Sequence, residues 1–564
     1  MKRAPLFVVL GLLAVALIVP VAGGELGFGS GAGPGASPSR VAAEVAARAS
    51  DSPTRAPTPT LTTTDGATPP AATPSAAPAD PLAAPSAPTP AATTQLAEVP
   101  IVPVTQFRAT VTGTTRKEVA AVLAGTSKRY EALELVAGEA DAVLAALGVD
   151  RPSDPAHLVE AKDAATLAKD MSAHRKRIAF LRADAVGPSV RALAWGGDTL
   201  FGVDRVRALK DWPLTASLPA GEAATAFDPA STWTLFAGGD IMLDRGVYQT
   251  LRVNGMGAAF PFRGGKADIT SRSCCSAFGW KVPRLARAGD AGAVRELISG
   301  ADVALANFEN PAPDRFTWHT KGTVFSADPT LIDGIADAGF DVMGIANNHI
   351  RDKGGPGLLQ TVKNLTKRGL LTVGAGKDLA AARKPAVMEI GGVKVAILAY
   401  DAIAGYYHAT ATKIGSAPMS LKVVAADIKA ARAAGADVVV VFPHWGVEYR
   451  ASAGAGQQKL ARQVIDAGAD MIIGNHAHWA AEMEVYQGKP IWYALGNLVF
   501  DQVWSEATME GMTLELTFRG KQLAQVRMRP HAILDKAQPN FLDPAGDGKI
   551  VMDRVFKASP DLPW

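Results

Sequence analysis

The second half of the chain alternates short apolar runs with longer stretches at helical spacing. This alternation predicts a layered α/β fold, since strands and helices that follow one another pack into layers. The predicted strands are Trp233–Ala237, Val303–Ala306, Val342–Ile345, Val393–Ala399, Val438–Phe442, Met471–Ile473 and Ile491–Leu495. The predicted helices between them are Gly357–Lys367, Leu421–Ala433 and Gln457–Ala467.

Two more predicted strands lie near the C-terminus, at Met512–Arg519 and Gln522–Arg529. Only Gly520 and Lys521 separate them, which is typical of a two-residue β-hairpin. Because a hairpin is antiparallel, the sheets of this region are expected to be mixed.

Residues 106–231 have a different pattern, which predicts a small α/β accessory module. Apolar residues at helical spacing predict helix across Glu118–Leu147, and Arg177–Leu181 and Val190–Trp195 are typical of short strands. The pattern indicates a structural spacer or a module that docks a partner.

The N-terminus is typical of an export segment covering residues 1–24. Lys2 and Arg3 precede the apolar run Leu6–Gly23, as in a signal peptide or a signal anchor. A signal peptide would be cleaved near Ala22. An uncleaved anchor would cross the membrane once and leave the rest of the chain on the extracytoplasmic face. The anchor is favoured, because the following segment is typical of a tether that crosses a cell wall.

Residues 25–105 form the predicted tether, a disordered linker rich in Pro, Ala and Thr. Of the 38 prolines, 15 lie between Gly31 and Thr105, and no aromatic residue lies between Phe28 and Phe107. Such a segment buries too little apolar surface to offset its ordering entropy, and its proline content keeps it extended.

Composition narrows the function classes. The net charge is only +3, which argues against a dedicated nucleic-acid-binding protein. The chain has 2 cysteines, which excludes a disulfide scaffold and a cysteine-based zinc site. Cys274 and Cys275 are adjacent in a polar segment, and we expect either a loop feature or free thiols there, with no chemical role.

Polar clusters follow six of the seven predicted strands of the α/β region. In open α/β sheets the carboxyl ends of strands meet at the binding site, so these clusters are expected to converge. They contain carboxylates, carboxamides and imidazoles, namely Asp240, Glu309, Asn347, Asn348, His349, His444, His476, His478 and Asn497. Mixed oxygen and nitrogen ligands suit one or two divalent ions of Mn, Fe or Zn. We expect His157, His174 and His531, outside these clusters, to be surface residues.

The ordered motifs GGDIMLDR, ANFEN, GIANNHIRDKG, PHWGVEY, GNHAH and YALGNLVFD resemble those of the CapA/PgsA-like poly-γ-glutamate (capsule) biosynthesis proteins. The resemblance covers about residues 232–505. It implies a fold related to the calcineurin-like metallophosphatases, a four-layer βαβ sandwich of mixed sheets over residues 232–535. Residues 536–564 are then a C-terminal tail.

The resemblance also implies a ligand set for two metal ions. Asp240 and His478 would bind the first ion, and Glu309 would bridge both. The second ion would be bound by Asn348, His444 and His476. Metallophosphatases have a histidine where this chain has Met242, so the first ion has fewer ligands.

Catalytic and substrate-binding roles follow from the same resemblance. His349 stands in the position of the general acid, and Arg245 would stabilise a developing oxyanion. Four residues would line the substrate pocket: Lys321, Trp445, Glu448 and Asn497.

Together these features predict a membrane-tethered, extracytoplasmic protein of capsule or poly-γ-glutamate synthesis or export. Its site would hydrolyse or transfer a phosphorylated or acyl substrate with the help of metal ions. The alternative is a non-catalytic partner of a polymer synthase or exporter that binds an anionic polymer. If the N-terminal segment is cleaved, a secreted cell-wall hydrolase is a third interpretation.

Overall fold

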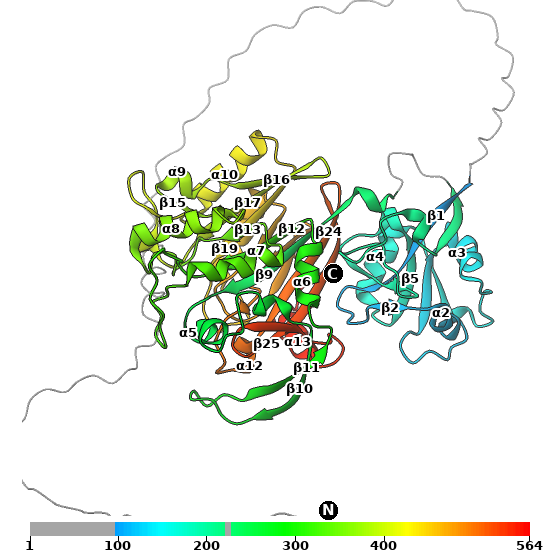
Figure 1. Ribbon diagram of the computed structural model, residues 1–564. Helices are drawn as coiled ribbons and strands as arrows, with labels where there is room; N and C mark the ends of the chain where they lie inside the picture. Colours follow the sequence, from blue (N-terminus) through cyan, green and yellow to red (C-terminus); the bar gives the residue numbers. More distant parts are fainter. Residues whose placement is uncertain (1–95, 220–226) are drawn as a thin grey trace, which may run out of the picture. The chain divides into compact units, whose positions relative to one another are not determined.

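A computed structural model describes residues 96–219 and 227–564, which belong to one compact unit (Figure 1). The predicted export segment and nearly all of the predicted linker lie outside these described residues. Within the described ranges, no helix has the length and apolar character needed to cross a membrane.

The accessory module is built on a mixed sheet covered by helices. Its strand order is β4-β3-β5-β1-β6, with β8 also paired to β1. These strands are β1 (Leu96–Gln106), β3 (Ala132–Val136), β4 (Leu158–Ala161), β5 (Arg177–Arg182), β6 (Val190–Ala192) and β8 (Thr215–Pro219). The helices are α2 (Arg116–Leu123), α3 (Ala140–Leu147) and α4 (Ala164–Ala173). A short parallel pair, β2 (Gly113–Thr114) with β7 (Ala194–Trp195), lies beside them.

Two predictions for this module need correction. The stretch predicted as helical contains strand β3 between α2 and α3. Leu133 and Leu135 are both fully buried and lie on one face of that strand, because they alternate with a period of two. The second correction concerns the linker, because β1 begins at Leu96, within the segment predicted to be disordered. The strand pairs with β5, β6 and β8.

The larger domain contains two mixed sheets. The first has the order β11-β10-β26-β25-β24-β9-β12-β13-β14, with β23 paired to β9. Its strands are β9 (Thr232–Ile241), β10 (Lys266–Ser273), β11 (Val282–Gly289), β12 (Val303–Phe308), β13 (Val342–Gly344), β14 (Leu371–Val373), β23 (Asn497–Val499), β24 (Glu510–Arg519), β25 (Gln522–Leu534) and β26 (Gln538–Phe541). The predicted hairpin is confirmed as β24 and β25.

The second sheet has the order β16-β17-β19-β20-β22-β21. Its strands are β16 (Ala386–Ile390), β17 (Val393–Asp401), β19 (Val438–His444), β20 (Met471–Ile473), β21 (Met483–Tyr486) and β22 (Lys489–Trp492). All the strands predicted in the α/β region therefore lie within or overlap strands of the structure.

Alternation along the strands sorts side chains between an inner and an outer core. In β19, Val438 and Val440 belong to the core shared by both sheets, whereas Val439 and Val441 face helices α10 (Leu421–Ala433) and α11 (Ala455–Asp466). Helices α6 (Ala293–Gly300), α7 (Ile332–Ala338) and α8 (Gly354–Thr366) cover the first sheet in the same way. The layers are therefore helices, sheet, sheet and helices, which confirms the predicted four-layer sandwich (Figure 1).

Residues 536–564 are not a tail, because they complete the core between the sheets. β26 joins the first sheet, and α13 (Lys549–Ala558) buries Val551, Met552 and Val555. The ring of Trp564 packs edge-on against that of Phe107 at 5.3 Å between centroids. The sequence pattern did not predict this role. Helix α13 presents only one face to the core, so its sequence mixes polar and apolar residues.

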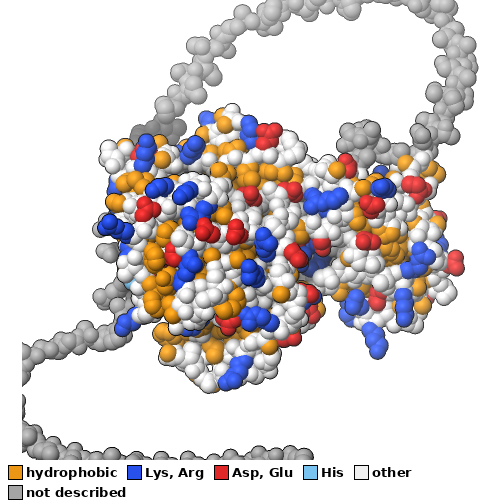
Figure 2. Space-filling view, in the orientation of Figure 1, with side chains coloured by type: hydrophobic (Ala, Val, Ile, Leu, Met, Phe, Trp, Pro, Cys, Tyr) orange, Lys and Arg blue, Asp and Glu red, His pale blue; other side chains and the backbone are white. Residues whose placement is uncertain are grey.

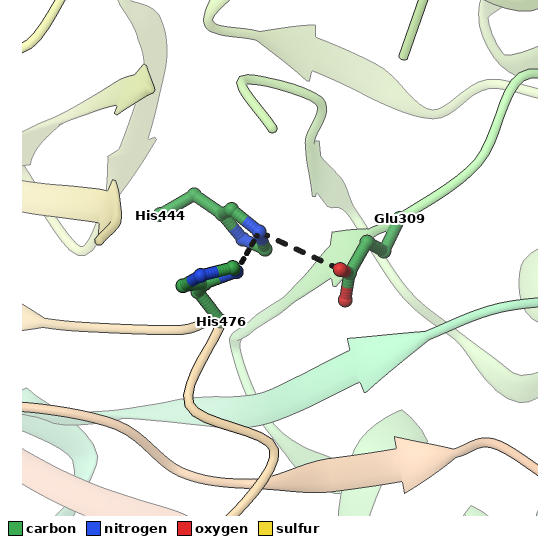
Figure 3. Close-up of side chains that lie close together, drawn as sticks. All are labelled: Glu309, His444 and His476. Carbon is green, nitrogen blue, oxygen red and sulfur yellow. Dashed lines mark hydrogen bonds and ion pairs between the residues drawn. The ribbon is translucent and has the colours of Figure 1, made fainter. Parts of the chain in front are cut away.

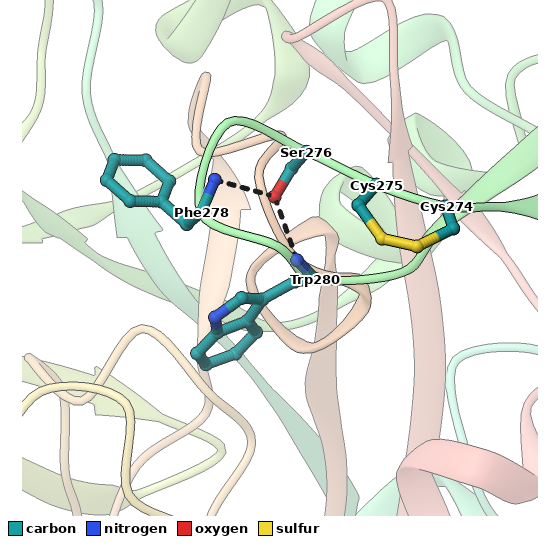
Figure 4. The surroundings of a disulfide bond; sticks show 5 residues. All are labelled: Cys274, Cys275, Ser276, Phe278 and Trp280. Carbon is teal, nitrogen blue, oxygen red and sulfur yellow. Dashed lines mark hydrogen bonds between the residues drawn. A yellow bond between two sulfur atoms is a disulfide. The ribbon is translucent and has the colours of Figure 1, made fainter.

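Strands β10 and β11 form a hairpin that the sequence pattern does not predict. Its tip contains Cys274 and Cys275, which are joined by a disulfide bond (Figure 4). The expectation of free thiols is therefore wrong. Most side chains of this hairpin are exposed or half-buried, so it lacks the apolar run that marks the other strands.

Candidate metal centre

The site lies where parallel strands of both sheets end side by side. In the first sheet Asp240, near the end of β9, lies opposite Asn307 of β12. Glu309 is the first residue after β12. In the second sheet His444 ends β19, and the loop that carries His476 and His478 follows β20. Because both sheets turn these ends to one another, residues far apart in sequence meet in one buried cluster.

One half of the cluster centres on the Nε2 atom of His444. This atom lies 3.1 Å from Nδ1 of His476 and 3.5 Å from Oε1 of Glu309 (Figure 3). It also lies 2.7 Å from Oδ1 of Asn348. Four side chains thus direct nitrogen or oxygen atoms to one point.

The other half is formed by Asp240, Glu309 and His478. Nδ1 of His478 lies 3.5 Å from Oδ2 of Asp240, and Nε2 lies 3.9 Å from Oε1 of Glu309. In each half the ligand atoms of the three His, Asp and Glu residues lie within 4.8 Å of one another. Glu309 belongs to both halves.

The donor set fits a divalent metal centre. Both carboxylate oxygens of Glu309 are buried and accept no hydrogen bond from any described residue. A buried carboxylate without a hydrogen-bond donor is destabilising. His444 and His478 approach Oε1 only to 3.5 and 3.9 Å, and a cation between the halves would supply a closer partner. Imidazole and carboxylate ligands suit Zn, Mn or Fe.

The charges in the cluster shift the pKa values of its members. Burial by itself raises the pKa of Glu309, but the nearby His478 and His444 outweigh it and lower the value to about 2. Burial by itself lowers the pKa of His478, but Glu309 and Asp240 raise it to about 9. Burial and the neighbouring His444 lower the pKa of His476 well below its usual value. The cluster thus holds Glu309 as an anion beside imidazoles, whereas burial and the neighbouring Glu309 raise the pKa of Asp240.

Backbone conformation supports a functional role for the loop after β20. His476 and His478 have φ angles of 91° and 57°, a region that non-glycine residues seldom occupy and that is frequent at functional sites. The close approach of β23 to β9 also constrains the backbone, because it requires glycine at position 239. A Cβ atom on Gly239 would lie 1.8 Å from the Gly496 carbonyl oxygen, which accepts a hydrogen bond from the Asp240 N–H.

His349, the predicted general acid, lies beside the cluster on the loop after β13. Its Nδ1 atom lies 2.8 Å from Oδ2 of Asp352, and its ring packs against Phe325 at 4.3 Å between centroids. These contacts fix the orientation of the ring and leave Nε2 as the nitrogen available to a substrate.

Arg245 is held by other groups of the protein. Its guanidinium binds Asp501 at 2.5 Å and the Gly322 carbonyl at 2.9 Å, and it lies over the rings of Phe325 and Phe500. Because Asp501 neutralises much of its charge, the predicted stabilisation of an oxyanion by Arg245 stays a prediction.

The four predicted pocket residues occupy different environments. Lys321 is exposed, Glu448 is half-buried, and Trp445 is buried in the outer core with its indole N–H bonded to the Tyr493 carbonyl. Asn497 is also fully buried, and its Oδ1 lies 2.9 Å from Nδ1 of His478. Asn497 therefore orients a candidate ligand, and substrate contacts by these residues stay predictions.

Several buried polar residues around the cluster were missed. Asn307 donates to Asp240 at 2.7 Å, and Asp401 at the end of β17 lies beside His444 in the sheet register. His531 was expected at the surface, but it is fully buried with Nε2 at 2.8 Å from the Asn497 carbonyl. The sequence did contain a signal for two of them. Asn307 directly precedes Phe308 in the ANFEN motif, and Asp401 ends an apolar run. His531 had none, because it lies within a strand.

An aromatic rim extends from the cluster towards the hairpin tip. Tyr449 stacks on His478 at 6.0 Å and contacts Trp479 and Trp504. Figure 4 shows Trp280 and Phe278 at the β10–β11 tip. Trp280 packs against Trp479, and Phe278 packs against Trp504. The hairpin therefore forms one wall beside the site, which its sequence did not indicate.

The chain is similar in sequence to known bacterial proteins. The sequence model of the family described as "Bacterial capsule synthesis protein PGA_cap" matches residues 234–502. "Capsule biosynthesis protein CapA" of Bacillus anthracis is 35% identical over 220 residues, which are 38% of this chain and 54% of that protein. A "probable polyglutamine synthesis accessory protein" of Mycobacterium tuberculosis is 30% identical over 340 residues, covering 55% of this chain and 82% of that protein. The chain spans about half the length of the B. anthracis relative.

A solved structure described as calcineurin-like phosphoesterase YfkN from Bacillus subtilis is also similar. It shares 15% sequence identity with a TM-score of 0.29, and the match covers 58% of this chain and 96% of that one.

Proposed function

Because the chain belongs to the bacterial capsule synthesis protein family PGA_cap, we propose that it is an accessory protein of capsule or polyglutamate synthesis or export. Its cluster binds one or two divalent cations and hydrolyses or transfers a phosphorylated or acyl group. The protein acts on the extracytoplasmic face of the cell membrane, beside the polymer synthase or exporter.

The orphaned carboxylate of Glu309 is the observation that supports a metal-dependent site. Glu309 belongs to both sets of histidine and carboxylate ligands. No described residue donates a hydrogen bond to either of its carboxylate oxygens. A purely structural buried glutamate would instead be paired, as Glu134 is with Arg177 at 2.9 Å.

The residues around the cluster divide the chemical tasks. Asp240, Glu309 and the histidines would hold a divalent cation, which would supply Lewis-acid polarisation of a phosphoryl or acyl oxygen. His349 delivers a proton to the leaving group from Nε2, while Asp352 at Nδ1 stabilises the protonated ring. The aromatic rim excludes water from one side of the site, which strengthens its electrostatic interactions.

Metal content and hydrolysis test this proposal together. Full-length protein is loaded with Mn²⁺ or Zn²⁺, dialysed, and assayed by elemental analysis and with a phosphodiester and a γ-glutamyl substrate. We expect one or two ions per chain and turnover that a chelator abolishes. Protein that retains no metal and hydrolyses neither substrate would contradict the proposal.

A second candidate function is non-catalytic binding of an anionic polymer. It is favoured by the half of the cluster that Asp240, Glu309 and His478 form. There Met242 is fully buried and its sulfur accepts a hydrogen bond from the Asp244 N–H, leaving three protein ligands. The face in Figure 2 mixes basic and acidic side chains, so polymer affinity has to arise locally. Polymer binding that persists in His349→Ala without any hydrolysis by the wild type would support this function.

A further inference from the structure

A second polar site lies in a cavity of about 1250 Å³ that none of the candidate metal ligands lines. The accessory module contributes the segment Thr112–Thr115 and Arg191 to its wall. Strand β25 of the larger domain contributes Arg527 and Arg529 to the wall. A cavity of this size with a few convergent polar groups is typical of a ligand site.

Arg191 is the unusual residue of this cavity. It lies in β6 with 7% of its surface exposed, and no described residue forms a hydrogen bond or an ion pair with its guanidinium. Burial together with the nearby Arg527 and Arg529 lowers its pKa to about 10. Buried guanidinium groups are ordinarily paired, so a partner for this one is missing.

The acidic side chains nearby are engaged elsewhere. Glu515 accepts from Arg529 at 2.6 Å and from the Val203 N–H at 2.8 Å. Asp204 pairs with Arg527 at 2.8 Å, and Glu118 accepts from Ser127 at 2.6 Å. At the far side of the cavity Asp290 binds Lys266, and Asp543 accepts from the Ala545 N–H. Glu515 raises the pKa of Arg191 against the effect of burial, but none of these carboxylates forms an ion pair or a hydrogen bond with its guanidinium.

The segment Thr112–Thr115, which lines the same cavity as Arg191, offers further donors. The hydroxyl of Thr114 is buried and has no hydrogen-bond partner among the described residues. Thr115 is the N-cap of helix α2 and accepts from Glu118 N–H. The N–H groups of Arg116 and Lys117, in the first turn of the eight-residue helix, have no acceptor in the described part of the chain. A helix N-terminus with free N–H groups attracts anions.

We propose that this corner binds a small oxyanion between the Arg191 guanidinium, the Thr114 hydroxyl and the N-terminus of α2. The ligand is a phosphate group or a carboxylate group, both of which match the planar donor geometry of arginine. Free phosphate and a glutamyl carboxylate of a polymer are the two sources of this chemistry. The site is independent of the metal cluster, and so of the function proposed for that cluster.

Equilibrium dialysis of the full-length protein with radiolabelled inorganic phosphate tests the site after a chelator has removed divalent metals. A parallel arm uses a γ-linked glutamate trimer as the competitor. We expect Arg191→Met to weaken phosphate binding by about 10- to 100-fold, because it removes a charged hydrogen-bond donor. Thr114→Val should weaken it by about 3- to 10-fold. Arg175→Met, which removes an exposed arginine outside the cavity, is the matched control.

Melting temperatures without phosphate separate binding from folding. Because Arg191 is a buried charge without a partner, Arg191→Met should melt at the same temperature as the wild type or higher. An arginine that serves only the fold would lower it. Equal losses of binding in Arg191→Met and Arg175→Met, or no binding of either phosphate or the trimer, would overturn the proposal. Binding of the trimer alone that Arg191→Met abolishes would support it, with a carboxylate as ligand.

Discussion

The metal cluster and the Arg191 cavity differ in the sign of the charge that each one lacks. At the cluster two buried carboxylates lie among histidines, and the atoms without partners are the oxygens of Glu309. In the cavity the Thr114 hydroxyl has no hydrogen-bond partner, and the Arg191 guanidinium forms no hydrogen bond or ion pair with a described residue. Burial makes an unpaired group costly in either case. The identity of the orphaned atoms therefore indicates a cation for the first site and an anion for the second.

The largest effect is expected from removing the negative charge of Glu309. Glu309→Gln should weaken binding of divalent metal by more than about 100-fold, since loss of an outer-shell partner alone costs about 10- to 100-fold. Elemental analysis after dialysis measures this. Phosphate binding in the Arg191 cavity should be unchanged.

Glu134→Gln is the control for this variant, because Glu134 is also fully buried but lies in the accessory module. If Glu309→Gln kept its full metal content, the Glu309 carboxylate would not be needed to bind a cation, and the contrast between a cation site and an anion site would be lost.

The next effect concerns His349 and distinguishes catalysis from metal binding. His349→Ala should lower turnover by about 100-fold or more, the usual contribution of a general acid, and leave metal content unchanged. Hydrolysis rates at saturating substrate measure this, with the exposed His174→Ala as control. Unchanged turnover would mean that His349 only stabilises the conformation of its loop and is not the general acid.

A third effect follows from the buried His531 below the cluster. Burial lowers its pKa to about 4, so the unfolded chain binds a proton on this residue at a higher pH than the folded chain does. Its contribution is fully present above about pH 6.5 and is lost as the pH falls towards 4. Between pH 7 and 4.5 this loss is about 2–3 kcal/mol.

Denaturant unfolding of wild type and His531→Gln at both pH values measures this contribution. The variant should lose less stability on acidification than the wild type does. Equal losses in both proteins would mean that His531 titrates normally.

The smallest effect is expected at Asn497, which orients His478. Asn497→Ala should weaken metal binding by about 10-fold, at the low end for a residue that acts through a ligand. Isothermal titration with Mn²⁺ measures it. Asn364→Ala removes another buried asparagine that donates to a backbone carbonyl and should leave the affinity unchanged. A loss as large as that of Glu309→Gln would make Asn497 a ligand in its own right.

Residues close to the strand ends could be predicted from the sequence because strand direction forces them together. Asp240, Glu309, His444, His476 and His478 each lie at or shortly after the end of an apolar run, and the parallel register brings them within 4.8 Å in two groups. Asp401 also ends such a run, but it was not predicted as part of the site because no other polar residue follows it directly. His531 lies inside a strand, where only pairing with neighbours reveals its contact.

The pattern of apolar runs by itself determined the layered α/β fold, the hairpin of β24 and β25 and the segments that carry the metal cluster. These features depend on residues close together in the chain, whose periodicity decides which side chains are buried. Only the tertiary structure decided that α13 completes the core, that the β10–β11 tip walls the site and that Arg191 is buried without a partner. Each of these depends on which distant side chains are neighbours, and the energy of a buried charge depends on those neighbours rather than on its place in the sequence.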